Sequence, residues 1–315
     1  MRDLTSELMT GRMAEVALEY AQGSRTPTPP HPAATVILLR NPPTTPTTPT
    51  TPTTPTAPTP PPAPTPPPGA ATPPAPVDPA GVHSGLEVYL LRRQRTMAFA
   101  AGMTVFPGGR VDPTDSTVAD SWSGPSPEWF AGRLGCSAAT AAAYVAAAVR
   151  ETFEESGVLL AGPSPDSIVD DTTGDDWEAD RVALESRELG FSEFLHRRGL
   201  VLRADLLGPW AHWITPEFEP KRYDTAFFVA ALPAGQITRD VTSESDQVTW
   251  IRPAEAVAAV DAGEVLMLPP TYICCHDLSQ YADVAAVLDA VGERTIRAIM
   301  PTVRVDGDQA YLETT

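Results

Sequence analysis

The stretch Arg150-Glu151-Thr152-Phe153-Glu154-Glu155-Ser156-Gly157-Val158 is the most informative part of this sequence. It closes the strongest predicted helix, residues 137–156, which is rich in alanine, a good helix former. Ser137 is a candidate N-cap, and Gly157 is a typical C-terminal stop. The stretch therefore forms the last turns of a helix.

Glu151, Glu154 and Glu155 are predicted to lie on one face of this helix. At about 100° per residue they share an arc of about 100°. Like charges at this spacing repel one another unless the face is solvated or a cation joins them. Carboxylate oxygens are hard ligands that suit Mg²⁺ or Mn²⁺. The residues alone leave a solvated acidic face and a divalent-metal site both open.

A glycine turn lies upstream, at the end of the predicted strand 103–109. Its residues Phe106-Pro107-Gly108-Gly109 allow a tight turn in which a backbone carbonyl approaches a metal or a phosphate. Together with the glutamate stretch, they resemble the Nudix hydrolase family. The signature of that family is a Gly, five residues, a Glu, seven residues, and then Arg-Glu-apolar-x-Glu-Glu-x-Gly-apolar. Gly109 matches the first glycine of the signature, and Val158 matches its last apolar residue.

The match departs from the family pattern in two places. Thr152 stands at a usually aliphatic position, and Asp115 stands where the signature has its first glutamate. Because 34 residues rather than seven separate Asp115 from Arg150, this part of the motif is 27 residues longer than in the family. The insertion is assigned to residues 116–137. Asp115 is not predicted to be a metal ligand.

The long insertion is itself informative about the branch of the family. The segments 33–40, 90–113 and 220–232 also resemble a branch with such an insertion, which includes peroxisomal coenzyme A diphosphatases. The resemblance implies the Nudix fold and hydrolysis of a nucleoside diphosphate linked to another moiety.

The resemblance also implies roles for residues of the motif. It makes Glu151, Glu154 and Glu155 ligands of Mg²⁺ or Mn²⁺ and gives catalytic roles to Glu151, Glu154 and Arg150. Arg150 orients a glutamate, and the carbonyl group of Gly108 or Gly109 lies near the metal and substrate. Glu244 matches an extra loop glutamate that many members use as a metal ligand, although a solvated loop acid is an equally good interpretation.

Further candidates come from the charge balance. The net charge of −18 opposes an anionic substrate, so local cations must bind its phosphates. Arg95 and Arg222 are predicted to do so. Glu178 and Glu185, in the charged helical stretch 176–199, lie outside the motif and are expected to be silent when changed to Gln. The aromatic cluster Trp210, His212 and Trp213 is interpreted as core rather than as a base-stacking platform.

Proline dominates one segment, residues 42–79, which contains 18 of the 36 prolines in the chain. A segment of this composition is predicted to be a disordered, extended loop. The predicted strands 33–40 and 85–95 flank it, so it is interpreted as an insertion within one domain. The domain is assigned to residues 33–305, with 1–32 as an N-terminal extension and 306–315 as a C-terminal tail.

Composition limits the class of protein. The acidic balance argues against nucleic-acid binding, and no apolar run reaches the length of a membrane span. The start of the chain lacks the apolar stretch of a secretory signal, so a cytoplasmic protein is predicted. Strands and helices without regular βαβ alternation predict an α+β fold with a mixed sheet between helices. A homodimer is compatible with the sequence.

The sequence leaves three functions open. The first is a metal-dependent diphosphatase for coenzyme A or acyl-CoA that releases 3′,5′-ADP and a 4′-phosphopantetheine product. The second is a diphosphatase for ADP-ribose, NADH or dinucleoside polyphosphates. The third, of a different class, is a nucleotide-binding or interaction module with weak catalysis.

Overall fold

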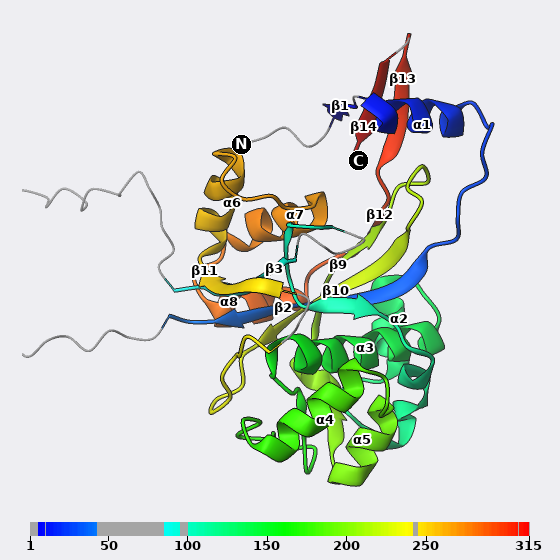
Figure 1. The fold of residues 1–315 in the computed structure, drawn as a ribbon. Helices are drawn as coiled ribbons and strands as arrows, with labels where there is room; N and C mark the ends of the chain where they lie inside the picture. Colours follow the sequence, from blue (N-terminus) through cyan, green and yellow to red (C-terminus); the bar gives the residue numbers. More distant parts are fainter. Residues whose placement is uncertain are drawn as a thin grey trace, which may run out of the picture.

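A mixed eight-stranded sheet forms the centre of the protein (Figure 1). The structure is a computed structural model that describes residues 6–9, 11–42, 85–94, 100–241, 245–307 and 309–314. The strand order is β11-β3-β2-β10-β9-β12, with β4 added beside β3 and β5 beside β2. Their bounds are β2 His31–Arg40, β3 Glu87–Arg93, β4 Thr104–Val105, β5 Gly108–Arg110, β9 Gly208–Ile214, β10 Tyr223–Ala231, β11 Ser245–Ile251 and β12 Ala298–Ile299.

Helices cover both faces of this sheet, as Figure 1 shows. On one face lie α2 Pro127–Leu134, α3 Ala138–Ser156, α4 Asp175–Glu185 and α5 Phe191–Arg198. On the other lie α6 Pro253–Asp261, α7 Pro269–Leu278 and α8 Val284–Val291. The pairs β2–β10 and β9–β12 are parallel, whereas β2–β3 and β9–β10 are antiparallel. The predicted α+β fold with a mixed sheet between helices is therefore confirmed.

The sheet buries apolar side chains on both faces because its central strands are apolar throughout. In β2, Val36 and Leu38 pack in the core that contains α3, whereas Ile37 and Leu39 pack in the core beneath α7 and α8. A strand covered on both sides needs such an unbroken apolar run, since successive side chains point to opposite faces.

The proline-rich tract joins two neighbouring strands. Its residues from 43 onward lie outside the described part of the chain, so its predicted conformation stays a prediction. On either side of it, β2 and β3 are antiparallel partners, with Leu39 opposite Val88 and Arg40 opposite Glu87. The two strands that flank the tract are therefore paired, while the assignment of the tract as an insertion within one domain stays a prediction.

Deletion of residues 44–76, with a short Gly-containing turn in their place, is expected to leave the Tm and kcat/KM nearly unchanged. The flanking strands already pair, and the Arg40 Nε to Glu87 Oε2 contact of 2.7 Å stands beside the junction. Loop-closure free energy changes by only about 0.6 kcal/mol for each doubling of loop length. Thermal unfolding and steady-state kinetics of the deletion protein test this. Loss of the folded state would show that the tract is structural.

The segment 112–136, which overlaps the assigned insertion, contains regular structure. It comprises the 3-10 helix η1 Pro113–Ser121, the short strand β6 Trp122–Ser123 and helix α2. Pro113 and Pro127 stand at the first position of a helix, where a missing N–H costs nothing. β6 pairs with β8 Val201–Arg203, which also pairs with β7 Ala161–Gly162, and the 3-10 helix η2 Ala204–Leu206 follows β8.

The charged helical stretch 176–199 forms α4 and α5 with a break between them, and helix α8 begins at Val284. At that start, the Asp283 side chain accepts a hydrogen bond from the Ala286 N–H and caps the helix.

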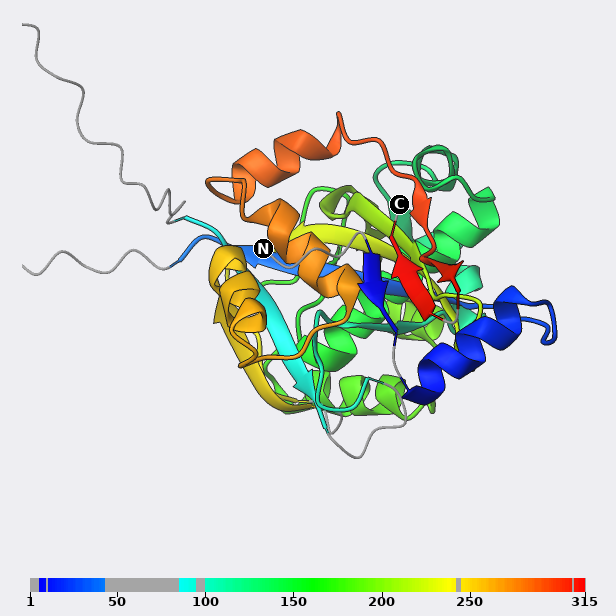
Figure 2. The ribbon, with the colours of Figure 1, turned by 90° about the horizontal axis from the view of Figure 1, so that it is seen from above.

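A second sheet joins the two ends of the chain. Its strands are β1 Ser6–Leu8, β14 Gln309–Glu313 and β13 Thr302–Asp306, in that order, and helix α1 Gly11–Ala21 packs beside them. We call β1, β13 and β14 the terminal sheet. The predicted extension 1–32 and tail 306–315 thus pair with each other. In Figure 2 the terminal sheet lies over the body of the molecule.

Among the described residues, every helix is too short or too polar to cross a bilayer.

Candidate active site

The C-terminal half of α3 carries the acidic face predicted from the sequence. The helix begins at Ser137, whose side chain accepts from Thr140 N–H, and ends at Gly157 with φ of +73°. Both predicted caps are confirmed. Glu154 and Glu155 are nearly buried in spite of their charge. An acidic face that is buried must be compensated by partners, since an isolated carboxylate is costly to desolvate.

Arg150 is the main partner of these carboxylates. Its Nη1 donates to Glu151 Oε1 at 2.8 Å and to Glu154 Oε1 at 3.1 Å. Its Nη2 donates to the Arg110 carbonyl at 2.8 Å. The side chain of Arg150 is only 8% exposed, so the pairs are shielded from solvent. Arg150 therefore holds two of the three glutamates, which agrees with the orienting role implied by the resemblance.

Asp115 completes this ion-pair cluster. Its Oδ1 accepts from Arg150 Nε at 2.9 Å, and its Oδ2 accepts from Arg150 Nη2 at 3.0 Å. Asp115 Oδ2 also accepts the Asp112 N–H at the start of η1. Burial raises the pKa of Asp115, while Arg150 opposes that rise. The spacing of five residues after Gly109 was the signal for this residue, and the long insertion obscured it.

The glycine turn lies directly against the acidic face. Gly108 N–H donates to Glu155 Oε2 at 2.8 Å. A Cβ atom on Gly109 would lie 2.5 Å from Glu151 Oε1, and one on Gly108 would lie 2.5 Å from the Ala34 carbonyl oxygen. Gly108 therefore requires glycine because it approaches backbone atoms, whereas a side chain at Gly109 would displace the Glu151 carboxylate. The structure thus brings Gly109 to Glu151 and Gly108 to Glu155, and Gly108 makes its contact through the amide N–H.

Burial changes the protonation of Glu154. It raises the pKa of Glu154 to about 8, and the neighbouring charge of Glu151 adds to the rise, whereas Arg150 opposes it. The carboxylates thus repel one another across the cluster, as the sequence suggested.

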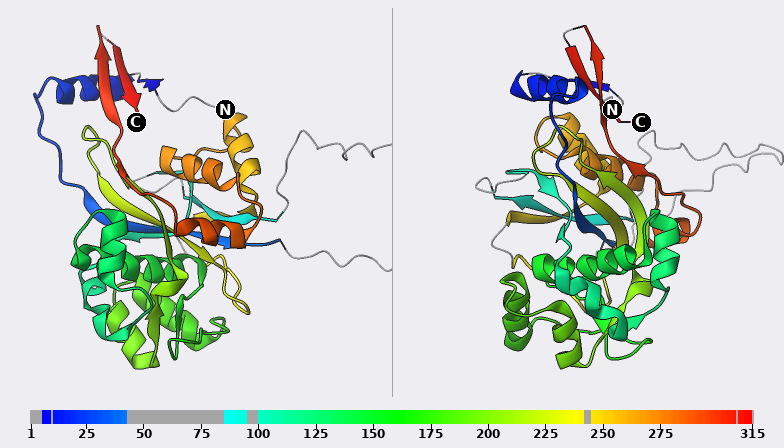
Figure 3. Two further views of the ribbon diagram at one scale, coloured as in Figure 1. Left: turned by 180° about the vertical axis from the view of Figure 1, so that it is seen from behind. Right: turned by 90° about the vertical axis from the view of Figure 1, so that its right-hand side faces the viewer.

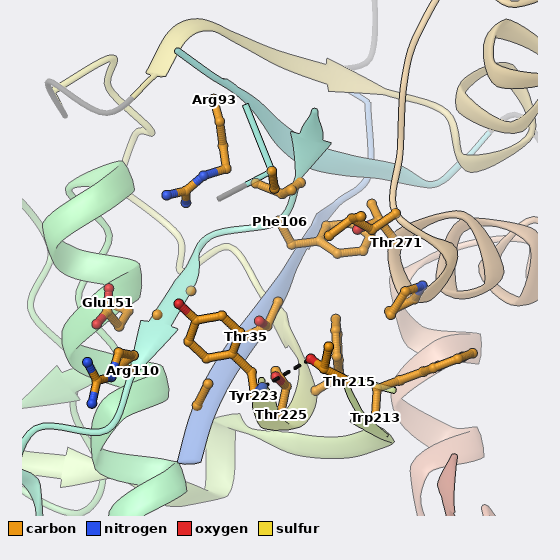
Figure 4. A pocket seen from close by; sticks show the side chains of 18 of the residues that line it. Thr35, Arg93, Phe106, Arg110, Glu151, Trp213, Thr215, Tyr223, Thr225 and Thr271 are labelled. Carbon is orange, nitrogen blue, oxygen red and sulfur yellow. Dashed lines mark hydrogen bonds between the residues drawn. The ribbon is translucent and has the colours of Figure 1, made fainter. Parts of the chain in front are cut away.

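A cavity of about 520 Å³ opens beside the acidic face and the glycine turn. In Figure 4, Glu151 and Arg110 lie on one side of it, and Trp213 and Thr271 lie on the opposite side. Arg93 of β3 stands above Glu151. The cationic lining residues that the structure describes are Arg93, Arg110, Arg150 and Arg187. This arrangement places positive and negative groups together at one end of an otherwise apolar cavity.

The donor set fits a divalent cation in chemistry. Three carboxylates line one cavity, and their oxygens are the ligands that Mg²⁺ and Mn²⁺ prefer. Within the described part of the chain, no group of three His, Cys, Asp or Glu side chains is arranged as a ready metal cage. Glu151 and Glu154 contact Arg150, and Glu155 contacts Gly108. A cation would compete with these partners for the carboxylate oxygens.

Comparison with known proteins finds similarity to one family. A family model described as the NUDT19 Nudix domain matches residues 130–278. The protein called putative nudix hydrolase 7, from Caenorhabditis elegans, is 29% identical over 201 residues, which cover 62% of this chain and 57% of that protein. Over this part of its length the chain is similar to the Nudix hydrolase family.

Two further similarities concern a curated relative and a solved structure. Acyl-coenzyme A diphosphatase NUDT19 of Xenopus laevis is 26% identical over 234 residues, 64% of this chain and 62% of that protein. The crystal structure of a NUDIX hydrolase from Alicyclobacillus acidocaldarius has the same fold, with a TM-score of 0.62 at 22% identity, and covers 86% of this chain and 99% of that one. The chain spans about three fifths of the length of the curated relatives from C. elegans and X. laevis.

Two predicted Nudix site residues, Arg95 and Glu244, lie outside the described residues, so their roles stay predictions. Arg222 differs from its predicted role. Its buried guanidinium donates to the Thr28 and Thr215 carbonyls at 2.7 and 3.0 Å, and its Nη2 lies 3.4 Å from Met300 Sδ. Arg222 is not among the described residues that line the cavity. Main-chain acceptors therefore engage the side chain that was expected to contact phosphate.

The aromatic cluster is divided between the core and the cavity. Trp210 is buried in the core, with Arg294 stacked 3.9 Å above its ring. His212 is buried between Asp224 and the Leu134 carbonyl. Trp213 is also buried, yet it contributes to the cavity wall.

Glu185 is a residue whose position the sequence did not reveal. It lines the cavity, although it was expected to be a silent surface charge. The buried Arg181 places it there, since Arg181 Nη1 donates to Glu185 Oε2 at 2.9 Å and to the Glu154 carbonyl at 2.8 Å. Arg181 thus links α4 to α3. The only signal in the sequence was the i,i+4 spacing of Arg181 and Glu185.

Proposed function

We propose that this protein is a metal-dependent diphosphatase of coenzyme A or acyl-CoA, with Mg²⁺ or Mn²⁺ as cofactor. Water is added across the diphosphate, and the products are 3′,5′-ADP and 4′-phosphopantetheine or its acyl derivative. The observation that carries the proposal is that Glu151, Glu154 and Glu155 line one cavity beside the Gly108–Gly109 turn. The coenzyme A assignment is supported by the name of the X. laevis relative.

The described residues suggest a division of roles. A bound divalent cation supplies positive charge for the phosphate oxygens and lowers the pKa of bound water. Glu151, Glu154 and Glu155 would hold that cation, and Glu151 or Glu154 would accept a proton from the attacking water. Arg150 fixes the orientation of both, because its Nη1 contacts each of them. Gly108 holds Glu155 through its N–H.

Cations in the cavity offset the negative charge of the chain. Arg93 and Arg110 line the cavity on the side of Glu151. Guanidinium groups bind phosphate through charge-assisted hydrogen bonds. We therefore propose Arg93 and Arg110 as the nearest phosphate contacts in the described residues, with Arg95 as a further predicted contact.

A panel of diphosphates tests the proposed function. The purified protein is incubated with coenzyme A, octanoyl-CoA, ADP-ribose, NADH and a dinucleoside polyphosphate, each with Mg²⁺, with Mn²⁺ and with EDTA. We expect 3′,5′-ADP from the two coenzyme A substrates and no product with EDTA. Faster release of AMP from ADP-ribose or NADH would assign the second function. If none of these substrates is hydrolysed, the third function, a nucleotide-binding module, would be favoured instead.

A further inference from the structure

The cavity has a charge asymmetry that restricts how a substrate lies in it. Its described cations, Arg93, Arg110, Arg150 and Arg187, all come from β3, β5, α3 and the segment after α4. We call the described lining residues from Trp213 to Leu312 along the chain the second lining group. They include no Arg or Lys, and their one charged residue is Glu219. A phosphate placed against this group would meet a carboxylate and no cation, so the group suits a neutral part of a substrate.

The second lining group also contains several large apolar residues. They are Trp213, Phe218, Leu268, Pro301 and Leu312. Burial of apolar surface is favourable in proportion to its area, about fourfold in affinity for each methylene group. A second nucleotide would bring phosphates and polar base edges to this wall, whereas a hydrocarbon chain would match it.

The terminal sheet supplies part of this wall. Leu312 of β14 lies opposite Val303 of β13 and also lines the cavity. Phe218, in the connection between β9 and β10, packs with Met9, Ala17 and Ala310 in a small core, and Leu312 packs against that core. Figure 3 shows the β9–β10 hairpin reaching toward α1 and the β13–β14 hairpin. The terminal sheet thus contributes Leu312 to the cavity wall, and Phe218 joins that wall to the core beneath the sheet.

Arg222 anchors this arrangement. It connects three separate segments, through the Thr28 carbonyl before β2, the Thr215 carbonyl after β9 and Met300 before β13. Thr215 and Pro301 both line the cavity. The residue expected to bind phosphate therefore positions the connections that lead to the terminal sheet.

We propose that the terminal sheet is a specificity element of the substrate site, and that Leu312 and Phe218 determine how large an apolar group the substrate carries beyond its diphosphate. The occupant is the acyl chain of an acyl thioester. This inference rests on the proposed coenzyme A function, and it predicts that acylated substrates bind more tightly than free coenzyme A.

Binding measurements on matched variants test the inference. Calorimetry with Mg²⁺, in a Glu155→Gln background that slows turnover, gives the Kd of coenzyme A and of octanoyl-CoA. We expect octanoyl-CoA to bind at least about tenfold more tightly in this background. Leu312→Ser should reduce that ratio severalfold. Val305→Ser is the matched control, because Val305 lies on the same hairpin, is 43% exposed and is not among the described lining residues.

A second variant covers the case in which Leu312→Ser unfolds the terminal sheet. Leu312→Trp keeps the site apolar and fills it, so it should weaken octanoyl-CoA binding while coenzyme A binding stays unchanged. Equal Kd ratios in the background protein, both Leu312 variants and the control would overturn the inference. If octanoyl-CoA binds tightly but the parent protein does not hydrolyse it, only the proposed activity is rejected. If neither coenzyme A nor octanoyl-CoA binds, both the proposed activity and the role of the terminal sheet are rejected.

Discussion

Glu155→Gln is expected to lower kcat on the best substrate by roughly two orders of magnitude, equivalent to about 3 kcal/mol of lost charge stabilisation. The change keeps the shape of the side chain, and its amide oxygen can still accept the Gly108 N–H that Glu155 Oε2 accepts at 2.8 Å. It removes one of three carboxylates that share a helix face and a cavity. The metal concentration needed for half-maximal activity should rise as well. The stability of the metal-free protein should not fall, because one like-charge repulsion is relieved.

The control for this change is Glu193→Gln, since Glu193 is an exposed residue of α5. Glu185→Gln is unsuitable as a control, because Glu185 lines the cavity. Initial rates across a Mg²⁺ titration measure the effect. Parent-like turnover by Glu155→Gln, or activity that persists in EDTA, would exclude the proposed mechanism.

Asp115→Ala is expected to lower the free energy of unfolding by roughly 3–5 kcal/mol, the range for removing one partner of a buried ion pair. The side chain of Asp115 is fully buried and accepts two hydrogen bonds from the guanidinium of Arg150. Without it, Arg150 Nε loses its partner in a site that water cannot easily reach. The hydrolytic rate should fall too, because Arg150 also holds Glu151 and Glu154.

Urea unfolding at pH 7 measures this loss of stability. Asp115→Asn, which keeps one acceptor oxygen, should lie between the parent and Asp115→Ala. Asp289→Ala on the exposed side of α8 is the control and should change stability by less than about 0.5 kcal/mol. If Asp115→Ala unfolds at the same urea concentration as this control, the Arg150 cluster contributes little to the fold.

The sequence alone predicted the parts of this protein that depend on local spacing. The shared face of Glu151, Glu154 and Glu155 follows from helix periodicity, and the caps at Ser137 and Gly157 follow from residues next to the helix. The pairing of β2 with β3 was predicted across the proline tract, because two short apolar segments cannot bury themselves separately.

Only the tertiary structure decided how distant segments meet. It paired Asp115 with Arg150, which lies 35 residues further along the chain, and it turned Arg222 toward main-chain carbonyls. It also brought Leu312 to the cavity wall. These contacts depend on which elements pack together, and neither residue type nor spacing encodes that. A buried arginine takes the nearest acceptors that packing offers, so Arg150 holds the catalytic carboxylates while Arg222 holds the connections to the terminal sheet.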